Sequence, residues 1–223
     1  MILKKMGIYD VNKLRTIVLY ESDFNHNNKF LGREMMKTAL DNHLMAPEQY
    51  SKPGRKAIDH ALNKKLIFDI TRYQKSRLAM TSCNLKSCYD RICHVPAVMA
   101  MERTGAPSEP IQSMFRTIET AKHTTRTAYG DSTVTYGGQE HYSAPIMGVG
   151  QGNRCGPQVW AAVSSAMFEV LRKKGLATKF CMPISKECLD LCGFAYVDDT
   201  DLIQSKNATN VCNDPDSTIE NMQ

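Results

Sequence analysis

The chain has 223 residues, of which 42% are hydrophobic and 23% are charged, a composition typical of folded globular proteins rather than disordered ones. No stretch approaches about 18 consecutive apolar residues, which argues against a membrane span. Residues 1–6 lack the apolar core of a secretory signal, so we expect an intracellular protein with reduced cysteines.

The net charge of +5 is unevenly distributed. Residues 1–86 hold 16 Lys and Arg against 8 Asp and Glu, whereas residues 87–223 hold 12 against 15. A basic half beside a mildly acidic half suits a polyanion-binding surface next to a carboxylate site, and scattered solvated charge explains the same numbers equally well. The eight cysteines contain no C-x-x-C pair, so a structural zinc site is not expected.

Hydrophobic periodicity predicts both helices and strands in the first half of the chain. Proline and glycine around residues 47–54 separate the two predicted helices. In chain order we expect an extended segment over 15–20, a polar loop over 23–28, a helix over 31–44, a second helix whose apolar stripe is Ile58, Ala61, Leu62 and Leu66, and a strand over 78–85.

The second half predicts a helix around 111–118, a hairpin that turns at Gly130 and Asp131, and a glycine-rich loop over 148–152. A long helix over 157–174 follows, with Trp160, Met167 and Phe168 on its apolar face. The last predicted elements are a hairpin over 193–203 and a helix that begins near Ser217. Helices and strands alternate in no regular order, which favours an α+β fold.

The hairpin over 193–203 carries adjacent aspartates, Asp198 and Asp199, between two apolar strands. Mg²⁺ prefers carboxylate oxygens and usually shares its coordination shell with phosphate. A two-metal phosphoryl-transfer site needs carboxylates from at least two segments of the chain. Taken alone, the pair is explained more simply as a solvated turn, so its meaning depends on the other motifs.

Four segments together resemble the motifs of reverse transcriptases. The sequence FAYVDD over 194–199 resembles the Y-x-D-D box, and Gly150-Gln151-Gly152 followed by Gly156-Pro157 resembles the Q-G-x-x-x-S-P box. Residues 49–59 resemble the fingers motif Q-x-G-F-R-x-G-R-S-x-x-D, one residue shortened, and residues 84–90 fall on the first catalytic box, D-I-x-K-A-F-D. The motifs occur in the family's order, and their pattern is closest to non-LTR retrotransposon and group II intron enzymes.

The resemblance implies the α+β right-hand fold of polymerases, with an antiparallel palm sheet and packed helices. It implies a fingers-like basic region over 1–80 and, over 81–223, an incomplete palm with the Y-x-D-D hairpin. Few residues follow Asp199, so we expect a truncated copy without the thumb. The implied reaction adds deoxynucleoside triphosphates to a DNA primer on an RNA template with two Mg²⁺ ions, in the nucleus or cytoplasm and away from membranes; the oligomeric state is left open.

The resemblance also implies roles for individual residues. Asp198 and Asp199 match the metal-binding aspartates, and Tyr89 matches a steric gate that excludes a ribose 2′-OH. An aromatic packing role for Tyr89 and ordinary surface positions for the basic residues are alternatives. The implied nucleotide-binding residues are Lys52, Arg55, Tyr89, Gln151 and Gly152, and the implied catalytic positions are Asn84, Asp198 and Asp199.

Asn84 stands where the family has a metal-bridging aspartate, and residues 70–89 contain no Asp or Glu. Asp90 cannot replace it, because six residues further on the chain has left the predicted strand. We therefore expect severely impaired catalysis, with a noncatalytic nucleic-acid-binding remnant as the main alternative. A viral RNA-dependent RNA polymerase fits less well, because Tyr89 fills the gate and Tyr196-Val197 replaces a glycine before the aspartates.

Overall fold

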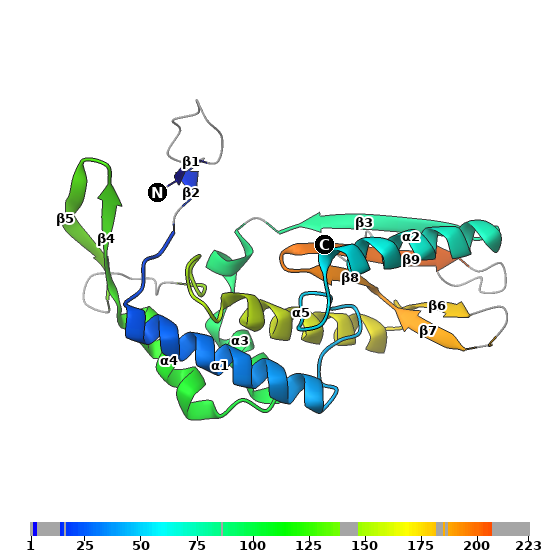
Figure 1. Ribbon diagram of the computed structural model, residues 1–223, viewed down its shortest axis with the longest axis horizontal. Coiled ribbons are helices and arrows are strands. Elements are labelled where there is room, and N and C mark those ends of the chain that lie inside the picture. The colour runs from blue at the N-terminus through cyan, green and yellow to red at the C-terminus, as the bar shows by residue number, and fades with distance from the viewer. Residues whose placement is uncertain are drawn as a thin grey trace. The chain divides into compact units, whose positions relative to one another are not determined.

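Helices and antiparallel strands are mixed along the chain, so the fold class is α+β, as predicted (Figure 1). The computed structural model describes residues 17–85, 87–138, 147–181, 185 and 187–206, with the backbone alone of residues 2–3, 14–15 and 206. The chain forms two compact units, residues 1–42 with 87–160 and residues 43–86 with 161–223. The predicted division at residue 80 follows chain order instead, and it stays a prediction.

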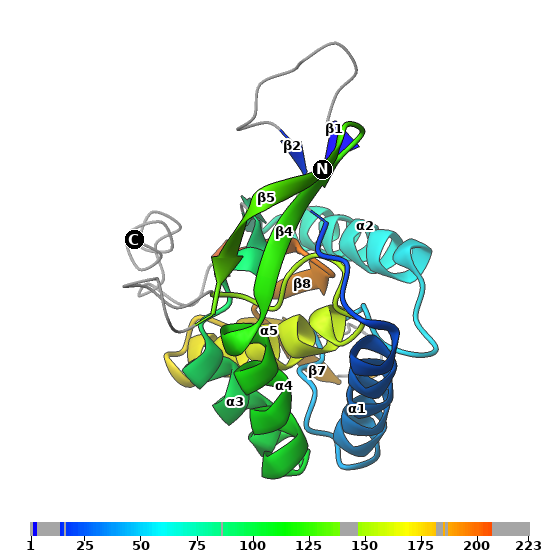
Figure 2. The same cartoon turned by 90° about the vertical axis from the view of Figure 1, so that its left-hand side faces the viewer.

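The first unit is mainly helical. Helix α4 buries Ile111, Phe115 and Ile118 at helical spacing, as predicted, and it packs against α1 and α3. Figure 2 shows β4 and β5 as a two-stranded hairpin that follows α4. The elements of this unit are β1 (Ile2–Leu3), β2 (Leu14–Arg15), α1 (Ser22–Asp41), the 3₁₀ helix η2 (Cys88–Arg91), α3 (His94–Arg103), α4 (Ser108–Thr120), β4 (Lys122–Thr127) and β5 (Gly130–Gly137).

The polar loop predicted over 23–28 is wrong, because helix α1 already begins at Ser22. Tertiary hydrogen bonds hold this polar turn: the Asn25 amide donates to the Gly152 carbonyl at 3.0 Å and accepts from the Arg154 amide at 2.9 Å. Asn28 is buried on the same helix. Partners more than a hundred residues away therefore order a segment that lacks any apolar periodicity.

The second unit is built on a three-stranded antiparallel sheet in the order β3-β9-β8, formed by β3 (Arg77–Asn84), β9 (Asp199–Lys206) and β8 (Gly193–Tyr196). Successive residues of a strand point to opposite faces, so each face has its own core. On one face α2 (Ala57–Tyr73) packs Ile67 against Phe194 and Ile203. On the other, α5 (Gly156–Lys173) packs Phe168 against Ala195 and Leu202.

Helix α2 has the predicted position, but its predicted apolar stripe does not form the buried face. The expected apolar stripe, Ile58, Ala61, Leu62 and Leu66, is exposed, whereas Ile67 and Thr71 are the buried residues. The face toward the sheet also contains Lys64, which pairs with Asp201 of β9. An ion pair between a partly exposed lysine and a buried aspartate is invisible to a count of apolar residues, so apolar periodicity did not indicate the side of the helix that packs.

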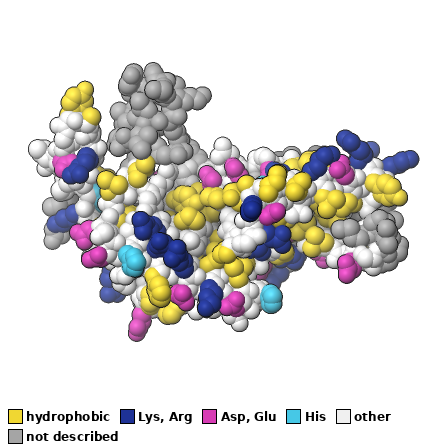
Figure 3. Space-filling model, viewed as in Figure 1, with side chains coloured by type: hydrophobic (Ala, Val, Ile, Leu, Met, Phe, Trp, Pro, Cys, Tyr) yellow, Lys and Arg dark blue, Asp and Glu magenta, His cyan; other side chains and the backbone are white. Residues whose placement is uncertain are grey.

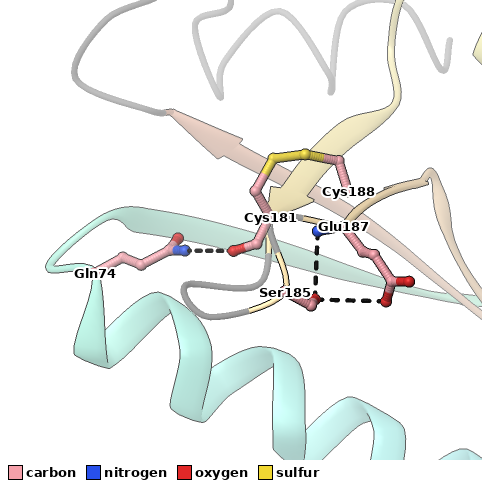
Figure 4. The surroundings of a disulfide bond; sticks show 5 residues. All are labelled: Gln74, Cys181, Ser185, Glu187 and Cys188. Atoms are coloured by element: carbon pink, nitrogen blue, oxygen red, sulfur yellow. Dashed lines mark hydrogen bonds between the residues drawn. A yellow bond between two sulfur atoms is a disulfide. The ribbon is translucent and has the colours of Figure 1, made fainter.

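A second hairpin joins β6 (Thr178–Cys181) to β7 (Cys188–Leu191) and is closed by a disulfide between Cys181 and Cys188 (Figure 4). The strand register places the two cysteines opposite each other, with their Cα atoms 4.0 Å apart. The Gln74 amide donates to the Cys181 carbonyl at 3.4 Å, which links the hairpin to the end of α2. The expectation of reduced thiols therefore fails for this pair.

Within the described ranges, no helix combines the length and the apolar composition that a membrane span needs.

The helix predicted from Ser217 lies outside the described residues. The hairpin predicted to turn at Gly130 and Asp131 is present, with its turn at Ala128 and Tyr129, two residues earlier.

Candidate active site

The two adjacent aspartates lie at a tight hairpin turn. Strand β8 ends at Tyr196 and β9 begins at Asp199, so only Val197 and Asp198 connect the strands. Val197 has φ of +57°, a left-handed conformation that a β-branched residue rarely adopts. Such strained residues concentrate at functional sites, and here the conformation leaves both aspartates exposed to solvent.

Asn84 faces this turn from the neighbouring strand. It is the last residue of β3 and pairs directly with Asp199 of β9, which pairs in turn with Tyr196 of β8. Directly opposed residues of antiparallel strands share a face, with Cβ atoms roughly 4.5–5.5 Å apart. The register thus brings the segments that resemble the first catalytic box and the Y-x-D-D box together at one end of one sheet.

A third aspartate lies one step further along the same face. Asp201 is buried, and its two carboxylate oxygens accept hydrogen bonds from Ser82 of β3 and Lys64 of α2. His60, one helical turn before Lys64, stacks on Tyr196 with ring centroids 6.0 Å apart. Burial and the nearby Lys64 lower the pKa of His60, which keeps this ring neutral beside the carboxylates.

The contacts of Asp201 predict a pH-dependent stability. Burial alone would raise the pKa of its carboxyl, but hydrogen bonds from Lys64 and Ser82 outweigh burial and lower the pKa. The stabilisation is therefore present above the ordinary aspartate pKa of about 3.9 and is lost as the pH falls through the lower folded-state value. We expect Lys64→Met to flatten the dependence of the unfolding free energy on pH between about 5 and 3.

Urea unfolding monitored by circular dichroism at several pH values measures this dependence. Lys65→Met is the matched control, because Lys65 pairs with the half-exposed Asp69 on the surface of the same helix. Equal pH dependence in the native chain and in Lys64→Met would contradict the assigned role of Asp201.

The two predicted triphosphate-contacting residues lie in the turn before α2, in the same unit as Asn84 and the aspartates. Lys52 is half-buried, and its pKa is lowered by burial and by the neighbouring Arg55. The exposed Arg55 guanidinium lies 6.0 Å from the centroid of the Tyr50 ring. Tyr50 packs in turn against Phe194 of β8, with ring centroids 5.9 Å apart. This packing anchors the turn to the sheet.

The remaining predicted nucleotide-binding residues belong to the first unit. Tyr89, in η2, accepts a hydrogen bond at its carbonyl from the Val149 amide at 2.8 Å. Two residues later in the glycine-rich loop, the Gln151 amide donates to the Asp90 carboxylate at 3.4 Å. The structure thus brings Tyr89, Gln151 and Gly152 into one cluster, although their motifs are about sixty residues apart in sequence.

Gly152 is required by close packing of its backbone. Its φ is +128°, and a Cβ atom there would lie 2.1 Å from the Val18 carbonyl oxygen. We expect Gly152→Ala to lower the free energy of unfolding by about 1–3 kcal/mol, because a backbone atom cannot move aside as a flexible side chain can. Gly54→Ala is the control: Gly54 has φ of +80° but open space around it. If urea denaturation shows equal losses for both variants, the contact with Val18 is unimportant.

The residues at the turn fit one divalent cation better than two. Mg²⁺ is usually bound by one or two carboxylates together with waters and substrate phosphates, and Asp198 with Asp199 offers such a pair. Asn84 adds an amide oxygen but no negative charge. No group of three or more His, Cys, Asp or Glu in the described part of the chain could hold a metal ion. The carboxylate that would bridge a second ion is missing.

Sequence reasoning missed Lys64 and gave Asp201 no role. For Asp201 a signal exists: a residue two positions after Asp199 in a strand shares its face. For Lys64 there is none, because its partner is 137 residues away.

Comparison with known proteins finds no family model that matches this chain and no match among curated proteins.

Proposed function

We propose that the chain is a reverse-transcriptase-type nucleotidyltransferase domain with a weakened metal site. The observation that carries this proposal is the pairing of Asn84 with Asp199, next to Asp198 at the hairpin turn. Two-metal phosphoryl transfer needs acidic ligands from separate segments at one point, and the sheet supplies that juxtaposition with one acid replaced by an amide. The motif order and the α+β class support the same proposal.

In the proposed reaction a primer 3′-OH attacks the α-phosphate of a deoxynucleoside triphosphate opposite an RNA template, and pyrophosphate leaves. Asp198 and Asp199 would hold a divalent cation, which would activate the hydroxyl and stabilise the leaving group. Lys52 and Arg55 contact the triphosphate, where a guanidinium can form two parallel hydrogen bonds. The motif resemblance alone assigns Tyr89, Gln151 and Gly152 to nucleotide binding, with Tyr89 as the gate against a ribose 2′-OH.

A noncatalytic nucleic-acid-binding protein is the second candidate. The observation that favours it is Asn84, because an amide brings no charge to the position where a bridging carboxylate is needed. In that case the basic residues of the chain bind RNA or DNA through phosphates, and affinity falls steeply with salt. Such binding is indifferent to Mg²⁺, whereas catalysis is not.

Primer extension on an RNA template with Mg²⁺ or Mn²⁺ tests the proposal. The full chain carrying Asn84→Asp is compared with the same chain carrying Asp198→Asn as well. We expect metal-dependent incorporation of deoxynucleotides, and not of ribonucleotides, by the first variant alone. Salt-sensitive binding of the template with no extension by either variant would establish the second candidate instead.

A further inference from the structure

The outward face of α2 carries a stripe of exposed apolar side chains, interrupted by Asp69 between Leu66 and Tyr73. Ile58, Leu62, Leu66 and Tyr73 form this α2 stripe, with exposed fractions of 58%, 59%, 48% and 78%. The spacing of four residues keeps the first three on one side of the helix, and Tyr73 continues the line two turns later. The stripe is roughly 22 Å long, at a rise of about 1.5 Å per residue.

The opposite side of α2 already makes the contacts that hold the helix. Ile67 and Thr71 are buried there, and Lys64 pairs with Asp201 of the sheet. The stripe is therefore not needed for packing among the described residues of this unit. Figure 3 shows hydrophobic side chains along α2, with Lys and Arg side chains near its junction with β3. Contiguous exposed apolar side chains of this kind mark interaction surfaces.

Basic residues lie at both ends of the stripe. Residues 52–77 contain eight Lys and Arg but only two Asp. Both aspartates are engaged locally: Asp59 accepts from the Lys56 amide at 2.8 Å, and Asp69 pairs with Lys65 at 2.7 Å. The exposed basic residues at the ends of the stripe are Arg55 and Lys56 before it, Arg72 next to Tyr73 at its end, and Lys75 and Arg77 after it.

We propose that the α2 stripe docks an acidic amphipathic helix, which sets its apolar side chains against Leu62 and Leu66 and its carboxylates against the basic ends. Helix-in-groove contacts of this kind use anchors at every third or fourth residue, the spacing that the stripe presents. Electrostatic complementarity selects an acidic partner over a basic one. This inference goes beyond the proposed polymerase function and does not rest on it.

The charges also exclude the other occupants. If two copies of this chain packed through the stripe, the basic ends of one copy would lie against the basic ends or the uncharged stripe of the other. No charge would be neutralised. Nucleic acid gains nothing from a row of Ile and Leu side chains. A membrane interface needs a broad apolar face, whereas Asp69 lies on the helix between Leu66 and Tyr73 and would be carried into the lipid.

Fluorescence anisotropy with defined peptides tests the proposal on the full chain. The probe is a labelled helical peptide of 17 residues, the length of α2, with leucines on one face and glutamates on both flanks. We expect saturable binding, at least about tenfold weaker for Leu62→Gln/Leu66→Gln. Val134→Gln, an equally apolar and exposed position on β5, is the matched control and should bind like the native chain.

A second pair of measurements separates charge from apolar contact. Arg72→Gln/Lys75→Gln should reduce the salt dependence of peptide binding without changing the fold. Equal binding of a peptide with lysine in place of glutamate would overturn the proposal. So would self-association of the chain that Leu62→Gln/Leu66→Gln abolishes, or binding to phosphatidylserine vesicles without binding to the acidic peptide.

Discussion

Replacing Asn84 by aspartate is expected to raise the primer-extension rate about 10²–10³-fold over the native chain, which is the effect typical of one preorganised stabilising group at a reacting centre. Asn84 is exposed at the end of β3 and pairs with Asp199, so the new carboxylate needs no rearrangement of the sheet. Side-chain size is nearly unchanged, and the added charge is available to a metal ion shared with Asp198 and Asp199.

Single-nucleotide extension under saturating primer and template measures this gain. Asn27→Asp, the same chemical change at an exposed position of α1, should leave the rate at the native level. The gain should vanish when Mg²⁺ and Mn²⁺ are removed by a chelator. If the native chain already extends as fast as Asn84→Asp, then the carboxylate at this position is dispensable and the account of the weakened site is wrong.

The second large effect concerns Glu48, which is fully buried beside the sheet. One of its carboxylate oxygens accepts from the Arg172 guanidinium at 2.5 Å and from the Cys192 amide at 3.1 Å. The Arg172→Met variant leaves this charge buried without its cation. We expect a loss of about 3 kcal/mol in the free energy of unfolding, the lower end for breaking a buried pair, because Arg172 itself is partly exposed.

Equilibrium urea denaturation followed by circular dichroism gives this value. Lys173→Met changes the next residue of α5, which is exposed, and should cost less than about 0.5 kcal/mol. Adding Glu48→Gln to Arg172→Met removes the stranded charge and should recover part of the loss. A loss in Arg172→Met no larger than in Lys173→Met would mean that water already solvates the Glu48 carboxylate.

Arg172 also shows that a rule based on local sequence can give the wrong reason for the position of a charged residue. Basic residues in the last turn of a helix are favoured by the helix dipole, which accounts for the run from Arg172 to Lys174 in sequence. The structure assigns Arg172 a specific partner in Glu48, far away in the chain. Lys173 and Lys174 remain exposed, so the dipole explains those two residues only.

Several elements were predictable because their signals are local. The long helix now seen as α5, the strand β3 and the amphipathic helix α4 all lie within a residue or a few of their predicted bounds. In α5, apolar periodicity agrees with Pro157 near the start of the helix and Gly175 just after its end. Helix α3 escaped prediction, because its ten residues include Pro96 and show little periodicity.

By itself, the sequence determined the α+β class, the tight turn that bears Asp198, and the absence of a carboxylate from residues 70–89. Only the tertiary structure decided which face of α2 is buried, that Lys64 neutralises Asp201, and that Asn84 pairs with Asp199. The reason is physical: helices and turns form from contacts within a few residues, whereas strand register and buried ion pairs join partners more than a hundred residues apart.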